Sequence, residues 1–253
     1  MGTDKKIALI TGGTGGMGTA ICKRLSEDGF RVVANYKDFT SESKWKEQAE
    51  QWKAEQTKAG VDAHIVQGDI SDFASSEIMF KQLYDEFGSV DVLINNAGIA
   101  RDAPLKKMTP QQWYEVINTN LNSVFICSRL AIEGMIAKKW GRIVSIASVI
   151  GHKGAYGLCN YATSKAGMYG FTKSLAVEVV KNGITVNTVS PGYCDTQLLQ
   201  GIPENILAKI LVQIPMDRLG KPSEIAGTVS FLCSDDAAFI TGTDISANGG
   251  QYM

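Results

Sequence analysis

Short runs of apolar residues alternate along the chain with longer segments in which apolar and charged residues recur at helical spacing. Seven apolar runs are typical of buried strands, at residues 6–11, 31–36, 64–70, 90–94, 141–147, 184–189 and 244–246. Helical spacing is found at residues 19–28, 43–58, 71–87, 110–117, 121–138, 161–181 and 222–232. Strands and helices that alternate in this way predict βαβ units, and therefore a parallel sheet covered by helices.

Local signals mark several boundaries between these elements. Thr109-Pro110 predicts a helix N-cap and first turn, and Asn182-Gly183 predicts a helix C-terminus. Ser190-Pro191-Gly192 predicts the end of a strand. The long connection over residues 193–219 predicts a lid over a functional site. Because no linker, repeat or low-complexity segment interrupts the pattern, we expect one domain over residues 1–253.

The composition argues against several classes of protein. Of the 253 residues, 44% are hydrophobic and 20% are charged, which suits a core that needs no disulfides. The net charge of -1 predicts no general attraction to nucleic acid or to a membrane. Five dispersed cysteines without a CxxC pair argue against a disulfide framework and a structural metal site, and they indicate a reducing cytoplasm. We find no signal peptide and no apolar run of about 18 residues.

A glycine-rich loop, residues 11–18, lies between the first expected strand and the first expected helix. Glycines at this place let the backbone approach a pyrophosphate, and the N–H groups at the helix start point towards it. The loop therefore indicates a dinucleotide site, and the alternative is a glycine-rich turn without a ligand. The strand before the loop and the helix after it favour the dinucleotide.

The second expected strand leaves the choice of dinucleotide open. In NAD-binding units an acid near the end of this strand accepts hydrogen bonds from the adenosine ribose. Here the strand ends at Tyr36, and Lys37 and Asp38 follow. Lys37 could meet the 2′-phosphate of NADP(H), or this segment could be a solvated turn. Asp69, after the third strand, could accept from the adenine amine or act as a turn or N-cap residue.

Three residues capable of acid–base chemistry lie between positions 148 and 165. Ser148 follows an expected strand, and Tyr161 and Lys165 lie one helical turn apart. A nearby ammonium would lower the phenol pKa from about 10 towards 7, a differential interaction of roughly 4 kcal/mol, and would make Tyr161 a general acid or base. Ser148 could then hold a substrate oxygen beside the phenol. The alternative is a packed ring with a lysine chain lying along it.

In this order and spacing the motifs resemble the short-chain dehydrogenase/reductase family along nearly the whole chain. The matching segments are the glycine loop, Asn95-Asn96-Ala97-Gly98, Thr119-Asn120-Leu121, Ser148, Tyr161 with Lys165, and Pro191-Gly192. The resemblance implies an α/β protein: a single-domain Rossmann fold with a doubly wound, seven-stranded parallel sheet and helices on both faces. It also implies an NAD(P)-dependent oxidoreductase without a catalytic metal.

The resemblance implies four catalytic residues and their roles. Tyr161 protonates the substrate oxygen as hydride is transferred, and Ser148 positions that oxygen. Lys165 lowers the tyrosine pKa and binds the nicotinamide ribose. Asn120 holds a water molecule that links Lys165 to solvent.

The cofactor site is expected to involve both ends of the dinucleotide. Its residues are Gly12, Thr14, Gly15, Gly16, Met17, Gly18, Tyr36, Lys37, Gly68, Asp69, Ile70, Asn96, Ala97, Gly98, Tyr161, Lys165, Pro191, Gly192 and Tyr193. Many NADP-dependent relatives carry arginine at the position of Gly15, which this chain lacks. The missing acid at Tyr36 argues against NAD. The choice between NADP(H) and NAD(H) therefore stays open, with a lean towards NADP(H).

Within the family the chain is most similar to reductases of 3-oxoacyl thioesters. The acetoacetyl-CoA reductases of polyhydroxybutyrate synthesis come first and the 3-oxoacyl-acyl-carrier-protein reductases second. The similar segments are residues 95–102, 107–109, 141–144, 151–154, 190–193, 240–242 and 246–251. The resemblance implies reduction of an acyl-CoA thioester to a (3R)-hydroxyacyl thioester. The expected substrate contacts are Ser148, Tyr156, Tyr161 and Tyr193.

The chain departs from these reductases between Ser148 and Tyr161. His152, Ala155 and Leu158 stand where glutamines are common, which bears on acyl length more than on reaction type. We expect His152 to make a loop contact.

Other residues near the expected pocket have open or minor roles. Cys159 and Cys194 are expected to be small packed residues without chemistry. Lys106, Lys107 and Lys153 could bind the phosphates of coenzyme A or could be ordinary surface residues.

Two long apolar helices predict an assembly. The segments 121–138 and 161–181 carry more apolar surface than one sheet face requires. In the family these two helices build a dimer interface and the C-terminal strand and tail complete a tetramer, so a homotetramer is expected. Two alternatives remain: an enzyme of the same class that acts on a free polyol or ketone, and a non-enzymatic, cofactor-sensing relative. Proteins of the second kind typically lose the tyrosine or the lysine, and this chain keeps both.

Overall fold

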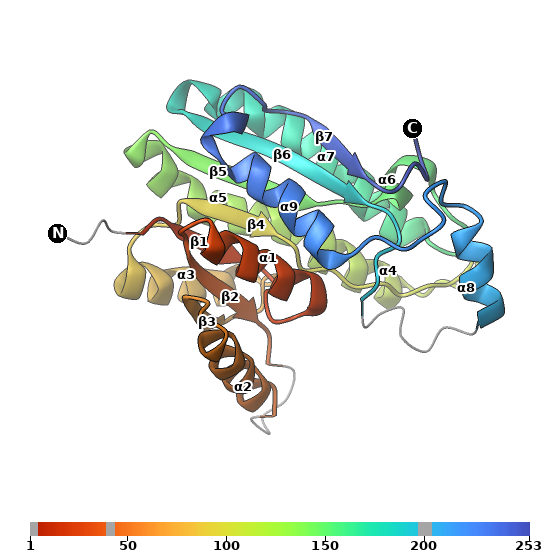
Figure 1. Ribbon diagram of the computed structural model, residues 1–253, viewed down its shortest axis with the longest axis horizontal. Helices are drawn as coiled ribbons and strands as arrows, with labels where there is room; N and C mark the ends of the chain where they lie inside the picture. Colours follow the sequence, from red (N-terminus) through yellow and green to blue (C-terminus); the bar gives the residue numbers. More distant parts are fainter. Residues whose placement is uncertain (1–4, 39–43, 197–203) are drawn as a thin grey trace.

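In a computed structural model that describes residues 5–38, 44–196 and 204–253, seven parallel strands form one sheet in the order β3-β2-β1-β4-β5-β6-β7 (Figure 1). The strands are β1 Ile7–Ile10, β2 Arg31–Tyr36, β3 Ala63–Gln67, β4 Val92–Asn95, β5 Gly141–Ile146, β6 Ile184–Pro191 and β7 Asp244–Ala247. The strand order reverses between β1 and β4. Ligands of such sheets bind outside the carboxyl ends of the strands at this switch point.

Helices cover both faces of the sheet (Figure 1). One face is covered by α1 Gly16–Glu27 and α9 Pro222–Cys233, and the other by α3 Phe73–Phe87, α5 Ser123–Lys138 and α7 Cys159–Val179. The remaining helices are α2 Lys44–Lys58, α4 Pro110–Ile117, α6 Val149–Lys153 and α8 Glu204–Leu211. No helix among these described residues has the length and apolar character to cross a membrane.

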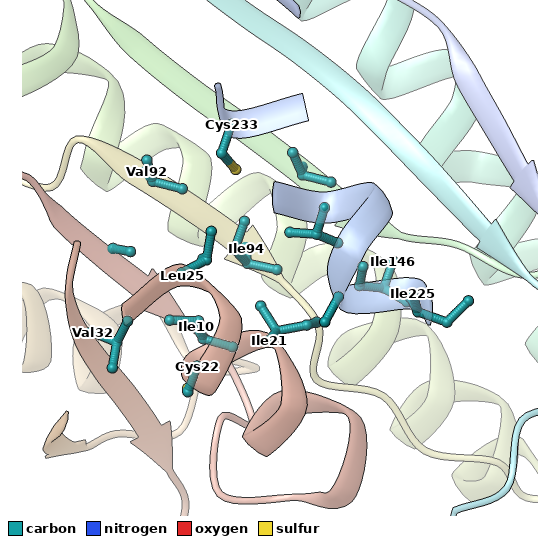
Figure 2. Close-up of a cluster of buried hydrophobic side chains, with 14 of the residues drawn as sticks. Ile10, Ile21, Cys22, Leu25, Val32, Val92, Ile94, Ile146, Ile225 and Cys233 are labelled. Carbon is teal, nitrogen blue, oxygen red and sulfur yellow. The ribbon is translucent and has the colours of Figure 1, made fainter. Parts of the chain in front are cut away.

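The sheet is apolar on both faces because both are covered. Figure 2 shows the core on one face of the sheet, in which Ile21 and Leu25 of α1 lie with Ile94 of β4 and Ile225 of α9. These four side chains are at most 1% exposed. Burial on both faces explains why the strands appear as continuous apolar runs and not as alternating patterns.

The predicted fold class is confirmed, while two strand ends were wrong: the third strand, predicted to reach residue 70, ends at Gln67, and the sixth extends further than predicted. The sixth strand does not end before Ser190-Pro191-Gly192 but continues to Pro191, which pairs with Ala247 of β7. Proline lacks an N–H donor, yet as the last residue of the strand it interrupts no further pairing. The next N–H group, that of Gly192, donates to the Ala247 carbonyl at 3.1 Å.

Two predicted helix ends have the expected chemistry. The Thr109 hydroxyl accepts from the Gln112 N–H, and the Gln112 side chain accepts from the Thr109 N–H, which forms a capping box for α4. Gly183 closes the turn after α7 with φ +72°, a conformation that favours glycine. The expected lid, residues 193–219, contains α8, and its residues 197–203 lie outside the described residues.

Candidate active site

The glycine loop and the segment after β4 are held together at the switch point. The Thr11 hydroxyl accepts from the main-chain N–H groups of Asn96 and Ala97, at 3.0 and 3.1 Å. In return the Asn96 side chain donates to the carbonyls of Thr11 and Gly12. These bonds join β1 to β4 at the point where a dinucleotide would lie.

The glycine loop fits the pyrophosphate of a dinucleotide. A Cβ atom at Gly18 would lie 2.5 Å from the Gly12 carbonyl oxygen, so the loop and α1 approach too closely for any other residue there. The outer side is open, because a Cβ at Gly16 would have its nearest neighbour 3.9 Å away. Since α1 begins at Gly16, the N–H groups of residues 16–18 have no acceptor within the helix and are available to phosphate oxygens.

Asn35 supports this loop, and the sequence patterns did not single it out. It is 3% exposed, within β2. Its Oδ1 accepts from the Gly12 N–H at 3.4 Å, and its Nδ2 donates to the Gly68 carbonyl at 3.0 Å. The available signal was a polar residue inside an apolar strand, because buried polar groups are retained where they are hydrogen-bonded.

Lys37 and Asp69 form an ion pair at the expected adenosine end of the site. Lys37 Nζ lies 2.6 Å from the Asp69 carboxylate. Desolvation raises the pKa of the Asp69 carboxyl, but hydrogen bonds from Lys37 and Ser71 outweigh it and hold that pKa below its usual value. Asp69 therefore has a charged partner, and its side chain also accepts from the Ser71 N–H at 3.0 Å. The N-cap of α3 is Asp72.

The remaining expected cofactor residues lie along the same edge of the sheet. Gly68 donates to the Tyr36 carbonyl at 3.0 Å, which ties the ends of β2 and β3 together, and Ile70 is buried beyond them. At the other end, a Cβ at Gly192 would lie 2.9 Å from Asn248 Cα. A glycine is thus required where the chain leaves β6 for Tyr193.

Ser148 and Tyr161 come together from two neighbouring helices. Ser148 follows β5 and caps α6, where its hydroxyl accepts from the Ile150 N–H at 3.2 Å. Tyr161 lies in the first turn of α7, which begins at Cys159. The Ser148 hydroxyl lies near enough to the Tyr161 phenol to lower its pKa. A substrate oxygen placed between these two groups would meet both.

Lys165 is buried one turn after Tyr161 on α7. Only 3% of the residue is exposed. Its Nζ donates to the Ile146 carbonyl at 2.6 Å and lies 5.7 Å from the centroid of the Tyr161 ring. Desolvation lowers the pKa of this ammonium to about 8.

For the protein without bound cofactor or substrate, the predicted direction of the Tyr161 pKa shift was wrong. The sequence predicted that Lys165 would make the phenol more acidic. Desolvation by burial instead raises the Tyr161 pKa; the hydrogen bond with Ser148 lowers it, and the charges of Asp102 and Tyr193 raise it. Burial depends on tertiary packing, which helical spacing does not reveal. The raised pKa keeps the phenol protonated, the form in which it can act as a general acid.

Asn120 lies beside Lys165 in a π-helical turn between α4 and α5. Its side chain is buried, and Oδ1 accepts from the Ile99 N–H at 2.8 Å. Nδ2 donates to the Ile99 carbonyl and to the Ser164 hydroxyl. A Cβ at Gly98 would lie 3.5 Å from both Asn120 Oδ1 and Lys165 Nζ, so these residues meet at one point.

Asp102 is an exposed residue near Tyr161 to which the sequence patterns assigned no role. Its charge raises the pKa of Tyr161, and burial raises the pKa of its own carboxyl. The available signal was an acid shortly after the segment 95–98. Of the two aromatics predicted to contact substrate, Tyr193 lies near enough to Tyr161 to influence its pKa, whereas Tyr156 is 89% exposed.

The structure confirms the predicted burial of one cysteine near the site and contradicts that of another. Cys159 is exposed at the start of α7 and is not the packed residue that was expected. Cys194 is buried, and desolvation raises the pKa of its thiol to about 11, so the thiol stays protonated. The three lysines considered for phosphate binding, Lys106, Lys107 and Lys153, are exposed.

Comparison with known proteins agrees with this geometry. A sequence model of the short chain dehydrogenase family matches residues 6–206. An acetoacetyl-CoA reductase of Cupriavidus necator is 47% identical over 249 residues, which cover 98% of this chain and 99% of that protein. One from Rhizobium meliloti is 45% identical over 249 residues, with the same coverage. A 3-oxoacyl-[acyl-carrier-protein] reductase of Staphylococcus aureus is 42% identical over 248 residues, 98% of each chain.

Proposed function

Because the chain belongs to the short-chain dehydrogenase family, we propose that it reduces acetoacetyl-CoA to a (3R)-3-hydroxyacyl-CoA with hydride from NAD(P)H. It is an NAD(P)-dependent oxidoreductase acting on a CH–OH group. The observation that carries the reaction type is the meeting of Ser148, Tyr161 and Lys165 beside a glycine loop. The substrate is supported by relatives at 42–47% identity that are named acetoacetyl-CoA reductase.

Ser148, Tyr161 and Lys165 each have a separate role in the reduction of the substrate carbonyl. The bound reduced nicotinamide supplies the hydride that adds to the carbonyl carbon. Ser148 donates to the substrate oxygen and fixes its position, and Tyr161 delivers a proton to that oxygen as negative charge develops. Lys165, still charged below its pKa of about 8, stabilises the tyrosine as it loses the proton.

Only the oxygen atoms of Asn120 are left to bind a water molecule that could relay protons to Lys165. Both N–H groups of its amide are used, by Ile99 and Ser164. A water molecule linking Lys165 to solvent would therefore be held by an oxygen of Asn120, either the remaining lone pair of Oδ1 or the main-chain carbonyl.

The experiment that tests the function is an initial-rate assay with acetoacetyl-CoA, following oxidation of NADPH and NADH separately. Turnover with either cofactor supports the proposal. The second candidate is a 3-oxoacyl-acyl-carrier-protein reductase, favoured by the Staphylococcus aureus relative. The same assay with the acetoacetyl thioester of acyl-carrier protein decides between them. Turnover only with that carrier would overturn the coenzyme A substrate and keep the reaction class.

The preference for NADP(H) over NAD(H) rests on Lys37. No acid stands at Tyr36 to hold the ribose hydroxyls, and the Lys37 ammonium at 2.6 Å from Asp69 can reach a 2′-phosphate while keeping that partner. Lys37→Ala is expected to raise the KM for NADPH by about 10-fold or more and to change the KM for NADH little, because charge-assisted contacts are worth roughly 1.5–3 kcal/mol. Equal effects on both cofactors, measured in parallel titrations, would contradict this role.

The rest of the substrate site is proposed on the same basis. Tyr193 would contact the acyl chain beside Tyr161, and Tyr156 would contact it at the outer edge. Lys106, Lys107 and Lys153 are exposed and could meet the phosphates of coenzyme A. The five free cysteines are consistent with a cytoplasmic enzyme, and the product would feed polyhydroxybutyrate synthesis.

We extend the proposal to a homotetramer. Phe125 on α5 is 51% exposed and Val177 on α7 is 79% exposed. A Cβ at Gly170 of α7 would have no neighbour within 4 Å, so this helix face is open. Exposed apolar side chains on two long helices suit a four-helix interface between copies of the chain.

Phe125→Asp is expected to break this assembly, because a carboxylate would be buried without a partner in the interface. Light scattering should show a species smaller than the tetramer. Ile78→Asp on α3 is the matched control, since Ile78 is 72% exposed on a helix outside the proposed interface. A wild-type monomer, or equal dissociation by both variants, would overturn the proposed interface.

A further inference from the structure

We propose that His152 and Asp244 form a positioning pair that holds the catalytic Ser148 in place. The kinetic part of this inference rests on the proposed function. His152 lies on α6, four residues after Ser148, and its Nε2 lies 2.9 Å from Asp244 Oδ2. Asp244 begins β7, and 92 residues separate the two side chains in sequence. The contact therefore connects α6, the helix that Ser148 caps and which we call the serine helix, to β7, the last strand of the sheet.

Aromatic rings hold His152 from both sides. The imidazole stacks on Tyr169 of α7 with ring centroids 4.4 Å apart and planes 15° apart. On its other face it stacks on Tyr252, at 5.0 Å and 4°. Asn248 Nδ2 donates to the Tyr252 carbonyl at 3.0 Å, which keeps this C-terminal residue in place. The imidazole is thus fixed by the two tyrosine rings as well as by its hydrogen bond to Asp244.

A closed path of hydrogen bonds leads from this pair back to Ser148. Asp244 Oδ1 accepts from the hydroxyls of Ser190 and Thr188, both at 2.6 Å. An ionised carboxylate only accepts, so Ser190 donates to Asp244 and its oxygen can accept from Tyr169, whose hydroxyl lies 2.9 Å away. The Tyr169 phenol has one hydrogen and also lies 2.9 Å from the Ser148 carbonyl oxygen, so it shares that hydrogen between the Ser190 oxygen and the carbonyl.

The path holds both ends of α6. Tyr169 binds the main chain of Ser148 at the start of this one-turn helix, and Asp244 binds His152 near its end. Such a short helix has little stability of its own, so its position depends on these outside contacts. Because the Ser148 hydroxyl caps α6 and lies near the Tyr161 phenol, a shift of α6 would misplace the group that orients the substrate oxygen.

Two substitutions separate this role from ring packing. His152→Phe keeps a flat ring between the tyrosines and removes the donor to Asp244, whereas His152→Gln loses the ring and keeps an N–H donor. Positioning through the hydrogen bond predicts a kcat about 10-fold lower for the phenylalanine variant, an unchanged KM for the cofactor, and a kcat near wild type for the glutamine variant. If ring packing were the cause instead, kcat would be near wild type in His152→Phe and lowered in His152→Gln.

The other histidine of the chain provides a matched control. His64 also pairs with an aspartate, Asp62 at 3.1 Å, and contacts an aromatic ring, that of Phe87, but it lies on β3 away from the serine helix. His64→Phe should leave kcat unchanged. Asp244→Asn tests the same contact from its other side, and its loss of kcat should not add to that of His152→Phe.

Hydrogen exchange decides the inference independently of any substrate. The N–H groups of Ile150 and Gly151 donate to the hydroxyl and the carbonyl of Ser148. In His152→Phe the exchange of residues 148–154 should be about 10-fold faster, with no such change in His152→Gln or His64→Phe. Unchanged exchange and unchanged kcat in His152→Phe would overturn the positioning pair. If the wild type does not reduce acetoacetyl-CoA, the proposed function fails and the exchange result alone decides.

Discussion

Tyr161→Phe is expected to lower kcat by about 10³-fold, because the variant keeps the ring and removes the only hydroxyl proposed to protonate the substrate oxygen. Burial keeps the Tyr161 phenol protonated, and the phenol lies near Ser148, as the proposed general acid should. The measurement is the initial rate with acetoacetyl-CoA together with a titration of cofactor fluorescence. Cofactor affinity should be unchanged.

A tyrosine away from the site serves as the control for that result. Tyr114 on α4 is 61% exposed, and Tyr114→Phe should keep full activity. A Tyr161→Phe enzyme that retained a tenth of the wild-type rate would refute the assignment of Tyr161 as the proton donor.

Lys165→Met is expected to abolish turnover and at the same time to stabilise the fold. Burial lowers the pKa of Lys165 from 10.5 to about 8, which corresponds to a cost of about 3 kcal/mol for keeping the charged form inside the protein. The hydrogen bond to Ile146 offsets about 1 kcal/mol of this. A methionine of similar length should therefore raise the free energy of unfolding at pH 7 by about 2 kcal/mol, measured by urea unfolding at fixed protein concentration.

The pH dependence of this gain gives a second test. Between pH 8 and 10.5 the unfolded wild type binds more protons at Lys165 than the folded protein does, so wild-type stability rises with pH across that range. The advantage of Lys165→Met should be largest below pH 8 and should shrink above it. Lys173→Met, an exposed position on the same helix, should show neither effect. A Lys165→Met variant less stable than wild type at pH 7 would contradict the account.

Much of the fold could be predicted from the sequence because its signals are local. Apolar runs of strand length, separated by helical periods, predicted all seven strands and their parallel pairing. Thr109 and Gly183 marked helix ends through chemistry that acts within a few residues. The extension of β6 to Pro191 was missed, because only pairing with β7 reveals it.

In the candidate site, too, some features follow from residue spacing and others depend on tertiary contacts. The sequence by itself determined that Tyr161 and Lys165 lie one helical turn apart and that the glycine loop is a continuous segment, and from this it predicted which side chains carry the chemistry. Only the tertiary structure decided how those groups titrate and what holds them. Burial sets the pKa shifts of Tyr161 and Lys165, and the contact of His152 with Asp244 joins residues 92 positions apart. Burial and contacts of this kind depend on how the whole chain packs, and no local spacing encodes them.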